Sequence, residues 1–191
     1  MKILVAHDGS AQSDALVSGL SRCGLPRAGE ARVLCVADAW VAVEGGPEPA
    51  GSAAETLRES RERAEEVAAS AARAVSARLP GWRVQPETTV GSPSWEILRK
   101  SEEWAPDLLL LGATGTSAFE RAAFGTTTLQ VTSHASCDVR IGRAQPPASG
   151  PVRLLIGFDG SAPALKAVEA VAAREWPPGS EARVVTAVDH H

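Results

Sequence analysis

The stretch that decides the fold is LLLLGATGTSAFERAAFGTTT, which spans residues 108–128. Its four leucines form a continuous apolar run, which is typical of a parallel strand that helices cover on both faces. Glycines follow at Gly112, Gly115 and Gly125, and three threonines come directly after the last of them. Glycine lets the backbone turn sharply and approach a ligand closely, and the first amides of a helix attract anions. The stretch therefore predicts a strand, a phosphate-binding loop and a helix. A strand–loop–helix connection that binds no ligand, and whose glycines only allow the chain to turn, fits the same sequence.

Short apolar runs alternate with longer helical patterns along the rest of the chain. We expect strands at residues 2–7, 31–37, 82–89, 107–112 and 137–141, and helices at residues 10–23, 52–79, 94–104 and 126–135. The glycine- and proline-rich residues 45–51 predict a loop ahead of the second helix. Strands that alternate with helices are joined by right-handed crossovers. The predicted fold class is therefore α/β, an open parallel five-stranded sheet with helices on both faces.

The beginning of this pattern returns near the end of the chain. KILVAHDGSAQSDALVSGL (residues 2–20) aligns with RLLIGFDGSAPALKAVEAV (residues 153–171), and ARVLCVAD (residues 31–38) aligns with ARVVTAVD (residues 182–189). Such self-similarity indicates an internal duplication. The second copy stops after strand, helix and strand, so it has no equivalent of the glycine loop.

The duplication divides the chain into three parts. We predict a domain at residues 1–143, a proline-rich linker at residues 144–151 and an extra C-terminal βαβ half-repeat at residues 152–191. A unit of about forty residues is too small to bury both faces of its own sheet. The half-repeat must therefore pack on the first domain, pair with another subunit or be the stub of a longer chain. We expect it to pack on the first domain or on a neighbouring subunit, hiding Leu154, Ile156, Val184 and Val185.

Charge and composition exclude several classes of partner. The formal net charge of −4 gives no general attraction to nucleic acid or to anionic membranes. The chain has no run of about eighteen apolar residues that could cross a bilayer, and it starts directly in a strand pattern rather than a signal peptide. Cys23, Cys35 and Cys137 are too few and too far apart for a disulfide framework or a zinc site. We therefore expect a cytoplasmic protein that binds neither nucleic acid nor membrane and has no metal-ligating cluster.

The glycine spacing separates this loop from two other phosphate-binding loops. A P-loop places Lys directly after its last glycine, whereas Thr126 and Thr127 follow Gly125 here. A dinucleotide-binding fingerprint follows the first strand, whereas this loop follows the fourth. The pattern Gly-x2-Gly-x9-Gly-Thr resembles the signature of the ATP-binding members of the universal stress protein family. The resemblance covers residues 1–141 as one full domain and residues 152–189 as the opening of a second, tandem repeat.

The resemblance implies the strand order 3-2-1-4-5, with ATP at the carboxyl edge of the sheet between the first and fourth strands. By position, it implies that Asp8 reaches towards the ribose and that Val36 lies against the adenine. The glycines would wrap the ribose and phosphates, while the Thr126 hydroxyl and the Thr127 amide would hold the distal phosphates. We expect Mg²⁺ to accompany the ATP, bound to its phosphates with few protein ligands. The complete set of implied binding residues is Ala6, His7, Asp8, Val36, Gly112, Gly115, Gly125, Thr126 and Thr127.

Several of these residues have an ordinary structural interpretation as well. Asp8 and Ser10 suit the cap of the helix that follows them, and Thr126 to Thr128 have hydroxyls suited to capping the helix that they begin. Val36 suits an ordinary core position. His7 is bulkier than the residues common there in the family, so it either contacts the base or obstructs it.

The predicted function is an ATP-binding stress-response or regulatory protein with slow hydrolysis at most. Hydrolysis needs a positioned base and charge stabilisation at the γ-phosphate, and the nearby Glu120, Arg121, Asp8 and His7 form no recognisable catalytic arrangement. The alternative is a non-catalytic interaction module whose pocket is vestigial or takes another adenine nucleotide, such as AMP.

Two departures from the family concern assembly and the second copy. The resemblance implies a homo-oligomer, most simply a dimer, but Asp138 and Arg140 stand in the last strand where the family has a proline and aliphatic residues. Asp159 matches Asp8 but has no glycine loop of its own. We expect it to bind nothing unless another chain completes the site.

Overall fold

The structure, a computed structural model, describes residues 1–38, 50–113, 125–142 and 150–187. Five parallel strands form the main sheet, in the order β3-β2-β1-β4-β5. The strands are β1 (Lys2–Ala6), β2 (Gly29–Asp38), β3 (Trp82–Gly91), β4 (Leu108–Gly112) and β5 (Asp138–Gly142). The predicted fold class and strand order are confirmed.

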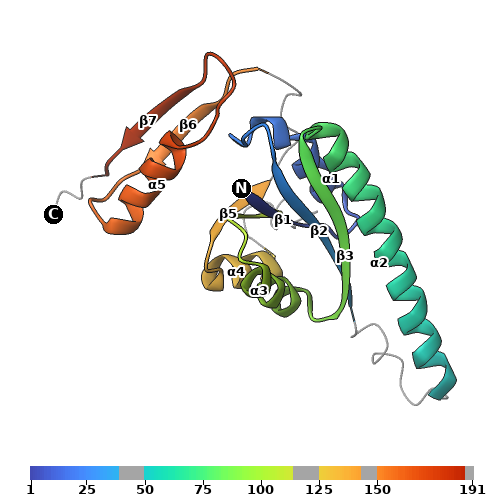
Figure 1. Cartoon of the computed structure of the whole chain (residues 1–191). Helices are drawn as coiled ribbons and strands as arrows, with labels where there is room; N and C mark the ends of the chain where they lie inside the picture. Colours follow the sequence, from blue (N-terminus) through green and yellow to red (C-terminus); the bar gives the residue numbers. More distant parts are fainter. Residues whose placement is uncertain (39–49, 114–124, 143–149, 188–191) are drawn as a thin grey trace.

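Helices cover both faces of this sheet (Figure 1). On one face lie α1 (Ala11–Ser18), the short 3-10 helix η1 (Leu20–Arg22) and α2 (Ala50–Arg78); on the other lie α3 (Pro93–Trp104) and α4 (Thr126–His134). Because side chains alternate along a strand, Ile3 and Val5 of β1 pack under the first helix layer and Leu4 packs under the second. Both β1 and β4 are therefore buried from two sides, which explains their continuous apolar sequences.

Two helix boundaries differ by more than one residue from those expected. The helix predicted at residues 10–23 ends at Ser18, where the Gly19 amide donates to the carbonyls of Ala15 and Leu16, and η1 follows it. The predicted end of the loop at residues 45–51 is wrong, since Ala50 and Gly51 already belong to α2. A glycine costs a helix about 1 kcal/mol, which the 29 residues of α2 tolerate. Residues 45–49 lie outside the described part.

A second, two-stranded parallel sheet follows, formed by β6 (Arg153–Gly157) and β7 (Glu181–Val185) with α5 (Ala162–Ala172) between them. Its register repeats that of β1 and β2, because Arg153 pairs with Glu181 as Lys2 pairs with Glu30. The hydrogen bonds agree as well: the Phe158 amide donates to the Val185 carbonyl at 2.9 Å, as the His7 amide donates to Leu34 at 2.9 Å. Residue numbers in the second unit thus exceed their equivalents in the first by 151.

The second unit contacts the first domain near η1 and the start of β5. Arg174 forms an ion pair with Asp138 at 2.8 Å, and the Arg22 guanidinium donates to the Pro151 carbonyl at 3.0 Å. Gly24 adopts a positive φ of +64°, and a Cβ there would lie 2.8 Å from Cβ of Arg174 and 3.1 Å from the Trp176 ring. Glycine at this position therefore permits the close approach of the two units.

These contacts hide only part of the apolar surface that we expected the half-repeat to bury. Ile156 is buried and Leu154 is half-buried, but Val184 and Val185 stay 55% and 47% exposed. Leu155 is 74% exposed, whereas its equivalent Leu4 is fully buried. In the first domain, α3 and α4 cover Leu4; no described element takes their place over Leu155.

This contrast predicts very different costs for the same substitution at equivalent positions. Leu4→Ala removes a fully buried side chain and should lower the free energy of unfolding by about 2–5 kcal/mol. Leu155→Ala, at an exposed position, should change it by less than about 0.5 kcal/mol. Urea denaturation followed by circular dichroism measures both values. Equal costs would contradict the burial described for the two strands.

Candidate functional site

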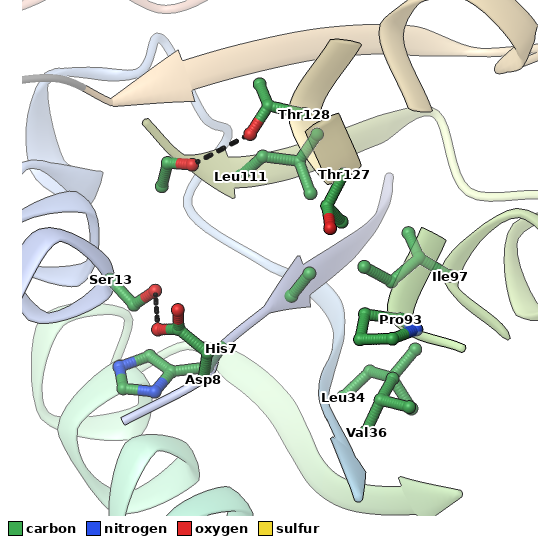
Figure 2. A pocket seen from close by; sticks show the side chains of 12 residues that line it. His7, Asp8, Ser13, Leu34, Val36, Pro93, Ile97, Leu111, Thr127 and Thr128 are labelled. Atoms are coloured by element: carbon green, nitrogen blue, oxygen red, sulfur yellow. Dashed lines mark hydrogen bonds between the residues drawn. The ribbon is translucent and has the colours of Figure 1, made fainter. Parts of the chain in front are cut away.

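A cleft of about 160 Å³ opens at the carboxyl ends of β1, β2 and β4. Parallel topology brings these three strand ends to one edge, where open α/β sheets bind ligands. The cleft is lined by residues of the strand ends and of the helix starts beside them: Ala6, His7, Asp8, Ser13, Leu34, Val36, Pro93, Ile97, Leu111, Gly112, Thr127 and Thr128. Figure 2 shows apolar side chains on one side of the cleft and polar side chains on the opposite side.

The apolar side is formed by Leu34 and Val36 of β2 together with Pro93 and Ile97 of α3 (Figure 2). Leu34 and Val36 point to the same face because they are two positions apart in a strand, and Pro93 and Ile97 share a face because they are four apart in a helix. The four side chains form an apolar surface that suits a flat, weakly polar ring.

Glu96 links the first turns of α3 to the end of β3 beside this wall. Glu96 accepts hydrogen bonds from Thr89 Oγ1 at 2.8 Å and from the Arg99 guanidinium at 2.6 Å. The hydrogen bonds from Arg99, with that from Thr89, hold the pKa of the Glu96 carboxyl below its ordinary value despite its burial. A Cβ on Gly91 would lie 2.9 Å from Glu96 Cγ, so the end of β3 also packs closely here. The same turns of α3 carry Pro93 and Ile97 of the wall.

Asp8 lies on the polar side, in the loop between β1 and α1. Its Oδ1 accepts from the Ser10 amide at 2.9 Å and from the Ser13 hydroxyl at 2.7 Å, while Ser10 is the N-cap of α1. Burial tends to raise the pKa of Asp8, but these hydrogen bonds outweigh it and the pKa lies below its ordinary value of 3.8. Asp8 is therefore ionised at neutral pH, and its Oδ2 has no hydrogen-bond partner among the described residues.

His7 is 6% exposed, and its hydrogen bonds keep it within the loop. Nδ1 accepts from the Gly9 amide at 3.1 Å, so Nε2 carries the ring proton. Nε2 lies 3.3 Å from a carboxylate oxygen of Asp14, but the angle does not suit a hydrogen bond and the buried atom has no such partner in the described structure. The ring is thus held beside α1, and it lines the cleft. Whether it contacts or obstructs a base stays a prediction.

The end of β4 is tied to both flanking helices at Gly112. A Cβ on Gly112 would lie 3.1 Å from Ser13 Oγ and 3.2 Å from the Ser13 amide nitrogen, so α1 approaches the strand closely. From the other side, Thr128 Oγ1 donates to the Gly112 carbonyl at 3.3 Å. Glycine at position 112 therefore allows α1 to approach the strand closely, and a larger side chain would need its neighbours to shift.

The helix α4 begins differently from the prediction. Its N-cap is Gly125, without a side-chain cap, so the expectation that the threonine hydroxyls cap this helix is wrong. Thr126 lies inside the first turn, and the buried Thr128 hydroxyl is turned towards the Gly112 carbonyl instead. The first amides of α4 consequently point out of the helix without a side-chain acceptor among the described residues, which is the usual arrangement of an anion site.

Six of the nine residues expected to bind a ligand line this one cleft: Ala6, His7, Asp8, Val36, Gly112 and Thr127. Gly125 and Thr126 lie next to it, at the start of α4. Gly115 lies outside the described residues, as do Glu120 and Arg121. Their role towards a ligand stays a prediction.

Sequence reasoning missed Ser13, Leu34, Pro93, Ile97, Leu111 and Thr128 as lining residues. Leu34 could have been found from strand alternation, because it precedes Val36 by two positions. Pro93 and Ile97 follow the third strand, whose end reaches the same edge of the sheet, but their contact with Val36 depends on how α3 packs.

The second unit has an open counterpart of this site around Asp159. The Asp159 carboxylate accepts from the Ser161 amide at 2.9 Å, and this bond lowers its pKa. Ala164 stands where the first domain has Ser13, so the hydroxyl bond of Asp8 has no equivalent. No described helix covers this site as α3 and α4 cover the first.

Within the described ranges, no helix is long and apolar enough to cross a membrane. The same residues contain no group of three or more His, Cys, Asp or Glu side chains that could hold a metal ion.

The lowered pKa of Asp8 predicts a pH-dependent contribution to stability. Because the folded pKa lies below the unfolded value near 3.8, ionised Asp8 stabilises the fold above that pH, and the contribution is lost as the pH falls through the folded pKa. Ser13→Ala removes one hydrogen bond and should raise the folded pKa of Asp8. The stability difference between pH 7 and pH 3 should therefore shrink. Carboxyl NMR titration and urea denaturation at both pH values measure these changes; an unchanged pKa would contradict the network.

Comparison with known proteins places the chain in a family. The model of the universal stress protein family matches residues 1–143. No curated protein matches the sequence. Among solved structures, UspA from Lactobacillus plantarum is 27% identical, with a TM-score of 0.58, over 75% of this chain and 97% of its own.

Two further solved structures have lower identity. A universal stress protein from Archaeoglobus fulgidus is 22% identical, with a TM-score of 0.70, over 97% of this chain; this chain spans 65% of that longer protein. An Arabidopsis thaliana family protein solved with AMP bound is 17% identical, with a TM-score of 0.50, over 75% of this chain and 91% of its own. The family match spans three quarters of the sequence, and the sheet order agrees with it. The chain belongs to the universal stress protein family.

Proposed function

We propose that this chain is a cytoplasmic regulatory protein that binds ATP in the cleft at the carboxyl edge of its main sheet, with slow or no hydrolysis. One observation carries the proposal: the apolar wall of β2 and α3 side chains faces the ionised Asp8 carboxylate across the cleft, and the start of α4, which has no side-chain cap, lies beside both. These three surfaces suit a base, a sugar and a phosphate chain respectively.

The adenine would lie against Val36, with Pro93 and Ile97 on the α3 side. The Asp8 carboxylate would accept a ribose hydroxyl through Oδ2, since Oδ1 is already engaged by Ser10 and Ser13. A carboxylate is a strong acceptor for a hydroxyl, and its ionised state needs no proton exchange on binding.

The phosphates would extend towards the start of α4. The amides there and the helix dipole favour negative charge, and the Thr126 hydroxyl and Thr127 amide lie at this point. The loop that carries Gly112, Gly115 and Gly125 would contribute further amides. Mg²⁺ would be bound mainly by phosphate and water oxygens, because Asp8 is the one carboxylate among the lining residues.

The cleft offers little for catalysis of hydrolysis. No Lys or Arg belongs to its described lining, so the described cleft has no cationic side chain to stabilise charge on a transferring phosphoryl group. The His7 ring accepts from the Gly9 amide through Nδ1, and its Nε2 faces Asp14 of α1. We also propose that residues 152–191 are the opening of a second repeat, on the evidence of the shared register and hydrogen bonds of the two units.

Asp8→Asn tests the ribose contact, and the equivalent Asp159→Asn is the matched control. Asn still accepts the Ser10 amide, so the cap of α1 survives, but a charged hydrogen bond to the sugar is lost. We expect the dissociation constant for ATP, measured by calorimetry, to rise about 10- to 100-fold in Asp8→Asn. Asp159→Asn should leave it unchanged. Equal values for wild type and Asp8→Asn would remove Asp8 from the site.

The nucleotide and its turnover are tested on the same protein. ATP at one hundred times its dissociation constant should stabilise the fold by about 2.7 kcal/mol, and Gly115→Val with Gly125→Val should abolish the shift. Parallel titrations with AMP and cyclic AMP identify the preferred nucleotide. Steady-state turnover should stay well below about 1 s⁻¹. A chain that binds no adenine nucleotide would instead favour the alternative, an interaction module with a vestigial pocket.

A further inference from the structure

The two sides of the apolar wall are joined to each other through β3. Val36 of β2 pairs in register with Thr89 of β3, and Thr89 Oγ1 donates to Glu96 Oε2 of α3 at 2.8 Å. Glu96 directly precedes Ile97, which belongs to the α3 side of the wall. The strand pair and this hydrogen bond therefore form a continuous path from the β2 side of the wall to its α3 side.

A second contact between β3 and α3 lies further from the cleft. Lys100 Nζ forms an ion pair with Glu87 Oε1 at 2.7 Å. Two residues of a strand span about 6.6 Å and four residues of a helix span about 6 Å, so the two contacts keep step along β3 and α3. Because β3 runs towards the carboxyl edge and α3 runs away from it, the Thr89–Glu96 contact is the one beside the cleft.

The contact beside the cleft depends on one hydroxyl. Glu96 is 8% exposed, and its carboxylate also accepts from the Arg99 guanidinium at 2.6 Å. Arg99 lies on α3 itself, so the Thr89 hydroxyl is the donor that ties the Glu96 carboxylate to the sheet. Removing this hydroxyl would loosen the link between β3 and α3 without leaving an unpaired charge, because the ion pair within α3 remains.

We propose that Thr89 and Glu96 are positioning residues for the base of a bound nucleotide, an inference that rests on the proposed function. Neither is among the described lining residues of the cleft, so both act through Val36 and Ile97. Their hydrogen bond sets the distance between α3 and β2, and this distance decides whether a flat ring contacts both sides of the wall. A gap of roughly 0.5–1 Å forfeits about a quarter to a half of a dispersion contact. A small shift of α3 therefore weakens binding of the base.

The full chain without ligand tests the positioning itself. Thr89→Val replaces the hydroxyl with a methyl group and keeps a β-branched residue in the strand. We expect the δ1-methyl resonance of Ile97 to shift in NMR spectra, and amide hydrogen exchange at residues 96–98 to quicken about 2- to 10-fold. Thr89→Ser keeps the hydroxyl and should stay close to wild type in both measurements.

Lys100→Met is the matched control at the second contact. It removes the ion pair with Glu87, which keeps Arg32 as a partner at 3.2 Å, so no charge is left unpaired. This variant should leave the Ile97 resonance and the exchange at residues 96–98 unchanged. An unaltered Ile97 resonance and unaltered exchange in Thr89→Val would overturn the proposal.

Calorimetric titrations with AMP and ATP test the effect on the base. Thr89→Val should raise both dissociation constants by the same factor, about 3- to 10-fold, because the two nucleotides share the base. Thr89→Ser and Lys100→Met should leave both constants close to those of wild type. Equal weakening by Lys100→Met, or weakening in Thr89→Val for ATP alone, would contradict a role towards the base.

The outcomes separate this inference from the proposed function. If wild type binds AMP or ATP and Thr89→Val binds them equally well, the inference fails and the proposed function stands. If wild type binds neither nucleotide, the proposed function fails, and with it the role of Thr89 towards a base. The measurements without ligand then still show whether the Thr89 hydroxyl holds α3 in place.

Discussion

The structure depends on burying β1 and β4 from both faces while they pair with each other. Parallel strands at the centre of a sheet need crossover helices on both sides, and the crossovers bring every strand end of one direction to a single edge. The cleft follows from this constraint, since Ala6, Val36 and Gly112 reach that edge from three neighbouring strands. Packing is close at Gly112, because Ser13 and Thr128 approach it from opposite helix layers.

Most of the fold, and about half of the cleft, could be predicted from the sequence. Continuous apolar runs such as Leu108–Leu111 identify buried parallel strands, and residues adjacent to strand ends can be placed at the edge without knowing the helices. Pro93, Ile97 and Ser13 were missed because their position in the cleft depends on how α3 and α1 pack. For α3, that packing includes the Glu96 cluster, which joins residues from β3 and α3.

The threonines at the start of α4 show a different limit of sequence reasoning. Three hydroxyls beside a glycine suit a helix cap, yet Gly125 takes the cap position and Thr128 bonds to the Gly112 carbonyl. Local preference favoured capping, but the tertiary contact offered a buried acceptor. Burial in the second unit shows the same limit, since β6 and β1 share a pattern while Leu155 and Leu4 have opposite environments. A strand pattern predicts the strand, whereas burial depends on the layers that reach it.

Asp8 shows how a side chain that serves the fold can leave one of its oxygens available to a ligand. Its Oδ1 is engaged with Ser10 and Ser13 at the start of α1, which keeps the carboxylate ionised and its rotamer fixed. Its Oδ2 stays free of the described residues and belongs to the cleft. In the second unit Asp159 keeps the bond to Ser161 but lacks the hydroxyl bond, the opposing wall and the second helix layer. The capping role is therefore common to both units. Among the described residues, only the first unit also has the hydroxyl bond, the opposing apolar wall and the second helix layer that a binding role would use.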